Sequence, residues 1–398
     1  MNDTPKRPTV RMQPSRHKRV AHGHPWAYSN EIQMDATTKA VPPGSVVRLV
    51  THNGAPLGCA TFNPHTLIAA RVLDQDPDAT VDRAFLAGRL ARAAALRERV
   101  VGRPFHRLVH AEADGLPALV VDRFGDVVVV QANSAGMDRL LPELLGALDD
   151  VLDPRAVVLR HDTPARGLEG LPSEVRVAKG EVEGPVAVEE NGLAFFADPA
   201  GGQKTGWFYD QRDNRAFVAG LAAGARVLDV YSYNGGFAVT CAARGAASVV
   251  AVDRSEGALD NGRRAAEANG VAGRCEFRKA DAFVELERMV EAGERFDVVI
   301  SDPPAFVKSK KDLAAGARGY RKLARLSAAV TAPGGFLLLA SCSHHMNPEL
   351  FGEQVAAGLA DARRTGRILR MAGAAPDHPV HPQLPESAYL KAWVLQVD

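Results

Sequence analysis

The fold class is decided by the stretch Arg226-Val227-Leu228-Asp229-Val230-Tyr231-Ser232-Tyr233-Asn234-Gly235-Gly236-Phe237, in which a short apolar run meets a pair of glycines. Further apolar runs lie at 248–253, 296–302 and 335–341, and none alternates with polar residues, as strands buried on both faces require. Helical stretches separate these runs, near 236–244, 255–269, 283–292, 312–331 and 349–363. This alternation predicts an α/β domain with a mostly parallel sheet, whose ligand binds at the carboxyl ends of the strands.

The composition restricts the class of protein. The 398 residues are 46% hydrophobic and 24% charged, which is typical of a globular protein of two or three domains. The formal charge of +1 excludes a polycation, so any nucleic-acid surface must come from local charge. No apolar stretch approaches the ~18 residues of a membrane span, and residues 1–7 lack a secretory signal. We therefore expect a cytoplasmic protein with no membrane partner.

The spacing of the four cysteines excludes two further kinds of structure. They are widely spaced and form no Cys-x-x-Cys motif, which argues against a disulfide scaffold or a zinc site, and we expect no metal.

Three regions differ in their pattern. Residues 1–76 are rich in Lys and Arg and hold short β-like runs between turn signals, which predicts a small, basic, β-rich module. Residues 79–197 predict an α+β domain, with valine-rich strands, a helix around 137–149 and a hairpin turning at Asn191-Gly192. Residues 198–398 hold the α/β pattern, completed by strands around 368 and from 389 to 397.

The loop after the first strand of this region suits a ligand. Glycines let a backbone approach a ligand closely, and the N-terminus of the following helix favours negative charge. A nicotinamide dinucleotide would prefer Gly-x-Gly-x-x-Gly, whereas Gly235 and Gly236 are adjacent and a third glycine is missing. The loop therefore predicts a ligand without a pyrophosphate.

Two acidic residues follow the next strands. Asp253 ends the second strand, where a carboxylate accepts hydrogen bonds from ribose hydroxyls. Asp281, followed by Ala282, comes after the third strand, where an adenine amine could lie. Ribose and adenine without phosphates describe S-adenosylmethionine. The alternative is that these acids only cap helices, as Asp often does.

The fourth strand ends in Asp302-Pro303-Pro304-Ala305-Phe306. Paired prolines expose rigid backbone carbonyls that suit the amine of a nucleobase, and Phe306 suits stacking on a base. Lys308, Lys310 and Lys311 follow, where cations can contact phosphates. The alternatives are an ordinary strand-ending turn and a solvated charged loop.

The fifth strand ends in Ser341-Cys342-Ser343-His344-His345. A thiol at that edge becomes a nucleophile when its pKa is lowered, although position alone leaves a buried, inert thiol equally open. Cys241 and Cys275 are expected in the core, and Cys59 lies in the N-terminal module.

Taken in order, these motifs resemble the PUA-domain-containing class I methyltransferases that act on large-subunit ribosomal RNA at cytosine carbon 5. The resemblance runs through the whole chain, at 19–32, 112–117, 122–125, 206–215, 232–237, 302–304 and 341–343. It implies a PUA-like module at 1–76, a central α+β domain at 79–197 and a Rossmann-like methyltransferase domain with a mostly parallel seven-stranded sheet at 198–398. It also implies S-adenosylmethionine as the cofactor and large-subunit ribosomal RNA as the partner. The oligomeric state stays open, with a homodimer as one option.

The resemblance further implies roles for named residues. Cys342 would add to carbon 6 of the cytosine, Asp302 would hydrogen-bond or protonate the ring nitrogen, and the backbone of Pro303 would hold the amine. Pro304, Phe306 and Lys308 complete the substrate set. The cofactor set is Asp229, Tyr231, Ser232, Asn234, Gly235, Gly236, Phe237, Asp253, Asp281, Ala282, Asp302, Tyr209, Gln211 and Arg212. For residues 209–212 the implied role is a cofactor lid or an RNA-facing helix, against the alternative of a charged helix start with local salt bridges.

The chain also departs from related patterns. Other RNA cytosine-C5 methyltransferases carry a second cysteine after the fourth strand, and residues 303–306 have none. Some members of the family have Lys where Ala305 stands, which puts a phosphate contact there in doubt. The base that removes the carbon 5 proton is not identified by the sequence.

Two other functions stay open on the sequence. Methylation of an exocyclic base nitrogen would also suit Asp-Pro-Pro followed by an aromatic residue, and would leave Cys342 idle. A non-catalytic RNA-binding or ribosome-assembly factor with a vestigial cofactor fold is the other alternative.

Overall fold

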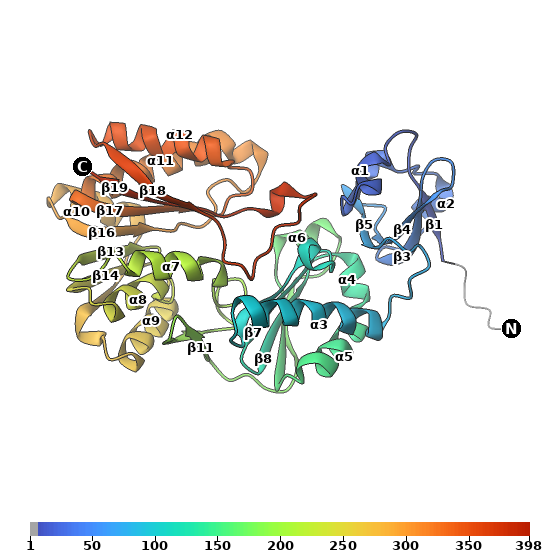
Figure 1. Ribbon diagram of the computed structural model, residues 1–398, viewed down its shortest axis with the longest axis horizontal. Helices are drawn as coiled ribbons and strands as arrows, with labels where there is room; N and C mark the ends of the chain where they lie inside the picture. The colour runs from blue at the N-terminus through green and yellow to red at the C-terminus, as the bar shows by residue number, and fades with distance from the viewer. Residues whose placement is uncertain (1–6) are drawn as a thin grey trace. The chain divides into compact units, whose positions relative to one another are not determined.

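The computed structural model describes residues 7–398. Residues 1–6, which carry most of the argument against a secretory signal, lie outside the described residues. The chain divides into two compact units, and each is built from separate stretches (Figure 1). The first comprises Met1–Gly184, Pro199–Gly206 and Pro376–Ser387, and the second comprises Pro185–Asp198, Trp207–Ala375 and Ala388–Asp398.

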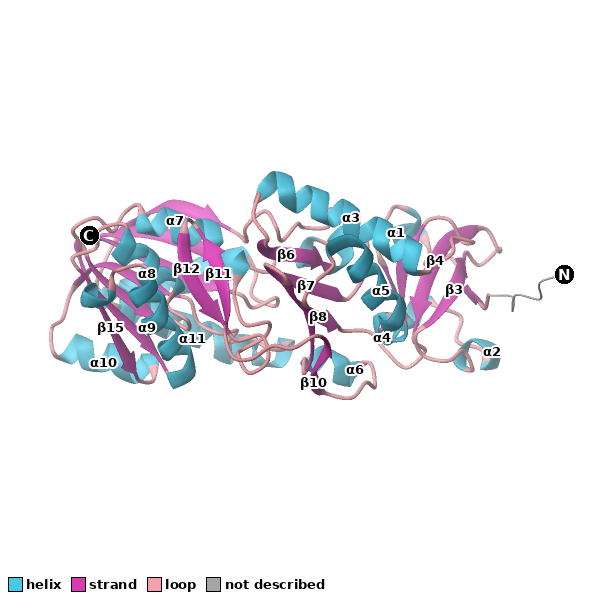
Figure 2. Ribbon diagram, turned by 90° about the horizontal axis from the view of Figure 1, so that it is seen from below, coloured by secondary structure: helices cyan, strands magenta, loops and turns pink. Residues whose placement is uncertain are grey.

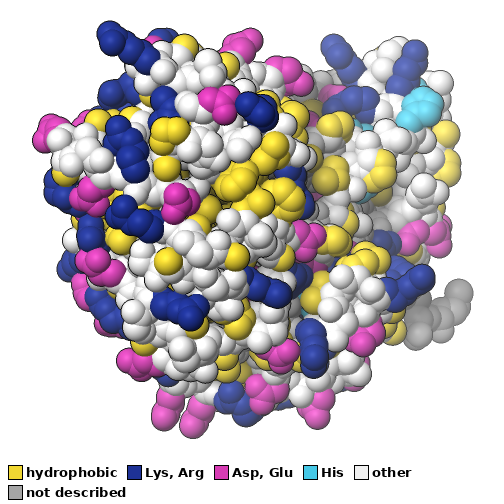
Figure 3. All heavy atoms as spheres, turned by 60° about the vertical axis from the view of Figure 1, so that its left-hand side comes forward, with side chains coloured by type: hydrophobic (Ala, Val, Ile, Leu, Met, Phe, Trp, Pro, Cys, Tyr) yellow, Lys and Arg dark blue, Asp and Glu magenta, His cyan; other side chains and the backbone are white. Residues whose placement is uncertain are grey.

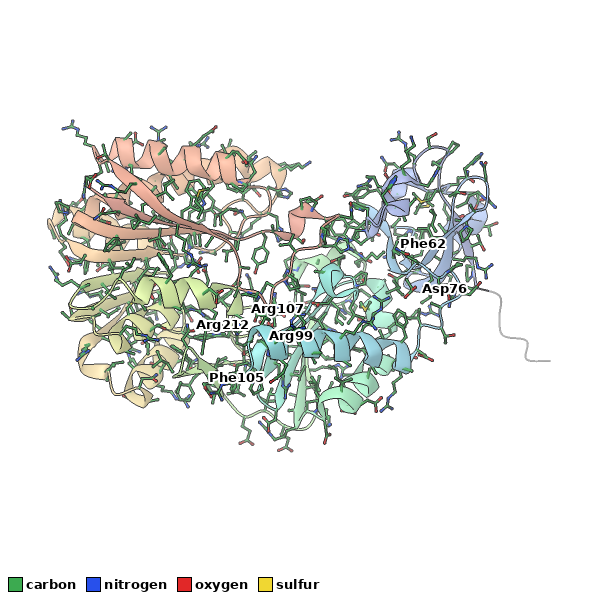
Figure 4. The ribbon with its side chains drawn as sticks, viewed as in Figure 1. Phe62, Asp76, Arg99, Phe105, Arg107 and Arg212 are labelled. Atoms are coloured by element: carbon green, nitrogen blue, oxygen red, sulfur yellow. The ribbon has the colours of Figure 1, made fainter. Side chains whose placement is uncertain are left out.

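The N-terminal part of the first unit is a five-stranded sheet in the order β1-β3-β4-β5-β2. Its elements are β1 (Thr9–Arg11), α1 (Lys18–Ala21), β2 (Trp26–Tyr28), α2 (Ala36–Lys39), β3 (Ser45–Val50), β4 (Pro56–Phe62) and β5 (Ile68–Asp74). The alternating burial along β3 follows its sequence, because Val47 and Leu49 face the core with Val10 and Phe62 (Figure 4). The predicted β-rich module is confirmed.

The central part of the first unit is a second five-stranded sheet, in the order β10-β9-β8-β7-β6. Helices α3 and α5 pack together beside it (Figure 2). The elements are α3 (Arg83–Val100), β6 (Phe105–His110), β7 (Leu119–Phe124), β8 (Val127–Ala132), α4 (Ala135–Arg139), α5 (Leu141–Leu152), β9 (Ala156–His161), α6 (Pro164–Leu168) and β10 (Glu174–Lys179). The helix expected around 137–149 is two helices, because Leu140 leaves the helical conformation and Pro142 starts a new first turn.

The second unit is built on a seven-stranded sheet in the order β15-β14-β13-β16-β17-β19-β18. The first five strands in this order are parallel, and β19 runs antiparallel to both β17 and β18. The strands are β13 (Arg226–Val230), β14 (Ser248–Asp253), β15 (Cys275–Lys279), β16 (Phe296–Ser301), β17 (Thr331–Ser341), β18 (Gly366–Ala372) and β19 (Lys391–Val397). The predicted mostly parallel seven-stranded sheet is confirmed.

Helices cover both faces of this sheet. They are α7 (Arg212–Ala219), α8 (Gly236–Ala243), α9 (Glu256–Ala268), α10 (Ala282–Glu291), α11 (Leu313–Val330) and α12 (Pro348–Asp361). Figure 1 shows α11 and α12 on one face and α7 and α8 on the other. Leu228, Val299 and Leu337 of the strands are buried in one apolar core with residues of α10, α11 and α12. Burial on both faces explains why these strands read as unbroken apolar runs.

The hairpin β11 (Val186–Glu190) and β12 (Leu193–Ala197) belongs to the second unit, whereas its sequence had grouped it with the central region. Its turn has positive φ at both Asn191 (54°) and Gly192 (78°), as an Asn-Gly hairpin requires. The side-chain amide of Asn269, the C-cap residue of α9, exchanges two hydrogen bonds with the backbone of Ala194 (3.0 and 2.7 Å), which ties the hairpin to this unit.

Short 3-10 turns complete the chain, at η1 (Ser29–Glu31), η2 (Ala111–Asp114), η3 (Tyr209–Gln211), η4 (Ala272–Arg274), η5 (Lys310–Asp312) and η6 (Pro385–Ser387). On the face seen in Figure 3, basic and acidic side chains are interspersed, as the near-neutral charge implies. Within residues 7–398, no helix is both long and apolar enough to cross a membrane.

Candidate active site

Four neighbouring parallel strands, β14, β13, β16 and β17, end at one edge of the seven-stranded sheet. Asp253 is the last residue of β14, and the loops that follow the other three strands carry residues 231–235, Asp302 and Cys342. Because parallel strands bring their carboxyl ends to the same edge, residues far apart in the sequence become neighbours there. Most of the predicted site residues therefore lie on one side of the second unit.

The loop after β13 is held in an unusual conformation. Tyr231 and Tyr233 have positive φ (64° and 48°), a backbone conformation that residues other than glycine rarely adopt. The loop is fixed from β14, because the amide of Tyr233 donates to Asp253 (3.0 Å) and that of Ser232 donates to the carbonyl of Val252 (3.0 Å). Asp253 thus positions the cofactor loop, a role that its sequence position did not predict. Strain of this kind is common at functional sites.

The two glycines of this loop are required by packing within the protein. A Cβ on Gly236 would lie 2.6 Å from Nε of Arg215, and a Cβ on Gly235 would lie 3.2 Å from Cα of Gly262. Gly235 also has φ of +73°. The sequence analysis explained the two glycines by close approach of the backbone to a ligand. The structure gives a different reason for them, which is close packing against other residues of the protein. Phe237 is buried beside the same Arg215 guanidinium, 5.6 Å from its ring centroid.

Asp229 is a buried carboxylate at the end of β13. Its Oδ2 accepts a hydrogen bond from the amide of Ala238 (3.0 Å) on α8. Burial raises the pKa of Asp229 to about 8, and the nearby negative charge of Asp302 adds to the rise. Two carboxyl groups so close together favour a positively charged group beside them.

Polar atoms without partners lie in and near the same loop. The hydroxyl of Ser232 and Nε2 of Gln211 are buried and, within residues 7–398, have no hydrogen-bond partner. Phe208, which precedes η3, stacks edge-on against Tyr233 with ring centroids 5.2 Å apart, so η3 reaches the loop. Buried polar atoms are almost always hydrogen-bonded, so these two groups are free to bind a polar ligand or a water molecule. These groups fit a polar ligand such as S-adenosylmethionine.

Residues 209–212 form a buried network. Tyr209 is 1% exposed, and Gln211 accepts a hydrogen bond from Asn214 (2.7 Å). Asp210, between them, accepts one from the hydroxyl of Tyr389 (2.6 Å). Arg212, at the start of α7 (Figure 4), lies over the Tyr209 ring and 3.9 Å from Glu190. Local packing and ion pairing thus account for much of this segment.

Asn234 and Asp281 have structural partners as well. Asn234 is buried and donates to the carbonyl of Phe196 on β12 (3.0 Å). Asp281 caps α10 by accepting from the amides of Phe283 (3.0 Å) and Val284 (3.3 Å), as the capping alternative predicted. Ala282 is buried in the first turn of α10. A contact of Asp281 with adenine stays a prediction.

The residues of the Asp-Pro-Pro loop and of the segment after it differ in their exposure to solvent. Pro303 is buried, Pro304 and Lys308 are exposed, and Asp302 is half-buried. Phe306 is half-buried and packs against Tyr320 and Phe283, with ring centroids 4.7 and 6.0 Å away, and its stacking on a base stays a prediction.

Cys342 is half-buried directly after β17, and its Sγ lies 4.0 Å from the carbonyl oxygen of Pro303. The other three cysteines differ from it. Cys59 and Cys241 are fully buried, and burial raises the pKa of both thiols. Cys275 is half-buried, and burial raises its pKa to about 11. Cys342 is thus the cysteine at the strand edge where the other site residues gather.

The sequence analysis missed several members of this site. Lys391 is buried at the start of β19, beside the end of β17, and Tyr389 lies next to it. Arg215 and Glu190 form a buried ion pair (2.7 Å) behind the loop after β13. A lysine within the otherwise apolar run 390–395 was a signal that could have been recognised. In the described part of the chain, no three His, Cys, Asp or Glu residues are grouped as metal ligands.

Comparisons with known proteins agree with this geometry. A family profile described as S-adenosylmethionine-dependent methyltransferase matches residues 156–395, and one described as PUA-like domain matches 10–75. The protein named ribosomal RNA large subunit methyltransferase I from Cronobacter sakazakii is 37% identical over 96% of this chain and 97% of its own length. Its namesake from Shewanella amazonensis is 36% identical over 98% and 99%.

Solved structures show the same fold. A candidate SAM-dependent methyltransferase from Streptococcus mutans superposes with a TM-score of 0.82, at 20% identity, over 98% of this chain and all of that chain. A second candidate methyltransferase, in complex with SAH, superposes with a TM-score of 0.83 at 20% identity, over 98% and 99% of the two chains. With matches of this extent and identity, the chain belongs to the S-adenosylmethionine-dependent methyltransferases, in the group whose curated members are named ribosomal RNA large subunit methyltransferase I.

Proposed function

We propose that this methyltransferase modifies large-subunit ribosomal RNA and forms 5-methylcytosine through a transient bond from Cys342 to the base. The observation that carries the proposal is the 4.0 Å separation between Sγ of Cys342 and the carbonyl oxygen of Pro303, next to Asp302. A nucleophile, an acceptor for a base amine and a carboxyl group thus come together at the strand edge. The names of the relatives supply the class of RNA.

The chemistry needs these groups because carbon 5 of cytosine is a poor nucleophile. The Cys342 thiolate adds to carbon 6, so the S–C6 bond forms and the electron pair of the C5–C6 double bond becomes available at carbon 5. Asp302 hydrogen-bonds the ring nitrogen and draws charge into the ring, while the Pro303 carbonyl accepts from the exocyclic amine. S-adenosylmethionine supplies an electrophilic methyl group, which carbon 5 takes. Loss of the carbon 5 proton then lets the S–C6 bond break and returns the thiolate.

The cofactor would be held by the loop after β13 and its neighbours. The unpartnered Ser232 hydroxyl and Gln211 amide are groups that it could satisfy, and the carboxyl groups of Asp229 and Asp302 suit its positive charge. We retain Tyr231, Asp253, Asp281 and Arg212 as proposed contacts.

The parts outside the methyltransferase unit would hold the RNA. We propose that the module at 1–76 and the central domain at 79–197 grip folded RNA with little sequence preference, since the target base must be flipped or presented in a loop. Lys308 is exposed after the Asp-Pro-Pro loop, where it suits a phosphate.

The decisive experiment compares Cys342→Ser with Cys275→Ser, a matched change of a half-buried thiol elsewhere in the same unit. Transfer of labelled methyl groups to large-subunit ribosomal RNA should fall by at least about 10³-fold in the first variant, as when other covalent nucleophiles are removed. It should be retained in the second. Both variants should bind S-adenosylmethionine normally by calorimetry.

Each alternative has its own outcome. Full turnover by Cys342→Ser, with methyl groups on an exocyclic nitrogen, would replace the covalent route by nitrogen methylation. Failure of the native protein to bind S-adenosylmethionine would favour a non-catalytic RNA-binding factor. RNA carrying 5-fluorocytosine gives an independent check, because its adduct cannot lose a carbon 5 proton and should survive denaturation only when Cys342 is present.

A further inference from the structure

Lys391 is a buried ammonium in an unusual setting. It is 5% exposed at the first position of β19, and its Nζ donates to the carbonyls of Ser343 and Tyr389, both at 2.7 Å. Among the described residues, no carboxylate forms an ion pair with it. Lysine is almost never fully buried without such a partner, since a desolvated charge is costly. The setting therefore favours a further source of negative charge close to the ammonium.

The fold places the Lys391 ammonium beside the residues that flank Cys342. The register of β17 and β19 pairs Lys391 with Ser341, the residue before Cys342, and Nζ holds the carbonyl of Ser343, the residue after it. Lys391 thus contacts the chain on both sides of the cysteine. Burial lowers the pKa of Lys391 to about 8, while the negative charge of Cys342 acts in the opposite direction.

Titratable and polar groups of the neighbouring elements lie near Cys342. Tyr320 of α11 shares a hydrogen bond with the hydroxyl of Ser343 (2.9 Å), and burial raises the pKa of Tyr320, so it stays neutral. The carbonyl of Pro303 approaches from the loop after β16, and Asp302 lies beside it. His344 follows in the chain and stacks on Tyr389 with centroids 5.4 Å apart. The carbonyl and the carboxyl group would disfavour a thiolate, so a cation is needed to offset them.

We propose that Lys391 is a positioning residue for Cys342, whose ammonium fixes the end of β17 and serves as the counter-ion of the thiolate. The inference rests on the proposed function, in which that thiolate attacks the base. The same ammonium would also stabilise the thiolate that leaves at the end of the reaction, once the carbon 5 proton has been lost. When the S–C6 bond forms, sulfur loses its negative charge and Lys391 is left unpaired; when the bond breaks, the electron pair returns to sulfur beside the ammonium.

The test measures alkylation of Cys342 by iodoacetamide against pH, read by mass spectrometry of the peptide that carries it, without RNA or cofactor. In Lys391→Met the pH midpoint should rise by about one unit or more, which slows alkylation by about 10-fold at a pH well below both midpoints, where the thiolate fraction falls tenfold per unit. Lys391→Arg keeps the charge and should stay near the native midpoint. Lys322→Met, which removes an exposed lysine of α11, is the matched control and should change nothing.

The outcomes separate this inference from the proposed function. An unchanged midpoint in a folded Lys391→Met protein overturns the inference, even when Cys342→Ser abolishes methyl transfer. A raised midpoint supports it, even if Cys342→Ser keeps full turnover and the covalent route fails. If Lys391→Met does not fold, the native profile decides: a midpoint well below the ordinary thiol value of about 8.5 supports the inference, and one at or above it overturns the inference.

Discussion

Charged side chains are buried in both compact units, but their partners differ. In the first unit, Arg97 is fully buried and donates to both carboxylate oxygens of Asp114 (2.5 and 2.8 Å) and to the carbonyls of Arg107 and Asp377 (2.8 and 2.9 Å). In the second unit, Asp229 and Lys391 are buried to a similar degree. Within residues 7–398, neither has an ion pair there.

The paired charges of the first unit hold parts of its chain together. Asp377 belongs to the stretch Pro376–Ser387, and its carboxylate accepts from the amide of Arg107 (3.0 Å) and contacts His378 (2.9 Å). Arg107, on β6 (Figure 4), is itself paired with Asp122 (2.8 Å). These contacts attach a distant piece of chain to the central sheet. Each charge is satisfied within the protein, so none is left to act on a ligand.

The unpaired charges of the second unit lie at the edge where the strands end. A protein keeps such costly groups where a ligand or a reacting atom completes them. Asp229 suits a cationic group, and Lys391 suits a thiolate. The comparison therefore teaches that the satisfaction of a buried charge, rather than its burial, distinguishes Asp229 and Lys391 from the Arg97 pair and from the supporting Arg215–Glu190 pair of the second unit.

The largest effect should follow from breaking the structural pair. Arg97→Met leaves the Asp114 carboxylate buried and unpaired, which should lower the free energy of unfolding of the first unit by about 3–5 kcal/mol. Urea unfolding monitored by hydrogen exchange in β6 and β7 would measure it. The double variant Arg97→Met/Asp114→Asn removes both charges and should recover part of the loss. A loss below about 1 kcal/mol in the single variant would erase the distinction between the units.

A smaller, pH-dependent effect is expected at Asp229. Its pKa of about 8 in the folded state exceeds the ordinary value of about 3.9, so the folded protein binds the proton more tightly. Stability from this group is therefore full below pH 4 and falls as pH rises from about 4 to about 8. Asp229→Asn still offers an acceptor to the Ala238 amide and should flatten this decline in the second unit.

Thermal unfolding of the second unit between pH 5 and 9 would show it. Asp260→Asn, which removes an exposed carboxyl group of α9, is the control and should leave the decline as it is. An equally steep decline in Asp229→Asn would mean that this carboxyl group is ionised without penalty.

Local sequence patterns predicted much of this arrangement. The apolar runs at 226–230 and 296–301 indicated parallel strands because burial on both faces leaves no room for polar residues. Cys342 and Asp302 were predicted as site residues because ligands bind where such strands end. The capping role of Asp281 was also readable, since a helix follows it directly.

Features that depend on long-range pairing were not predictable. Lys391 lies beside Ser341 and Ser343, the neighbours of Cys342, only because β19 runs antiparallel beside β17, about 50 residues away in the chain. Phe306 looked available for stacking, and its packing on Tyr320 depends on where α11 crosses the sheet. The reason for Gly236 lies in the guanidinium of Arg215, which no local pattern places there.

The smallest effect should come from an exposed ion pair with nearly the same geometry as the Arg97 pair. Arg83 donates to both oxygens of Asp150 at 2.6 Å, but the two side chains are 54% and 47% exposed. Asp150→Asn should leave the unfolding midpoint of the first unit unchanged, because water and salt screen the pair and because an acid near the end of α5 opposes the helix dipole. Differential scanning calorimetry at low and high salt measures this. A drop of several degrees in the unfolding midpoint would mean that bidentate geometry, and not desolvation, determines how much an ion pair contributes to stability. The difference between Arg97, which has a bidentate carboxylate partner, and Lys391, which has two carbonyl partners, would then be a difference in hydrogen-bond geometry alone.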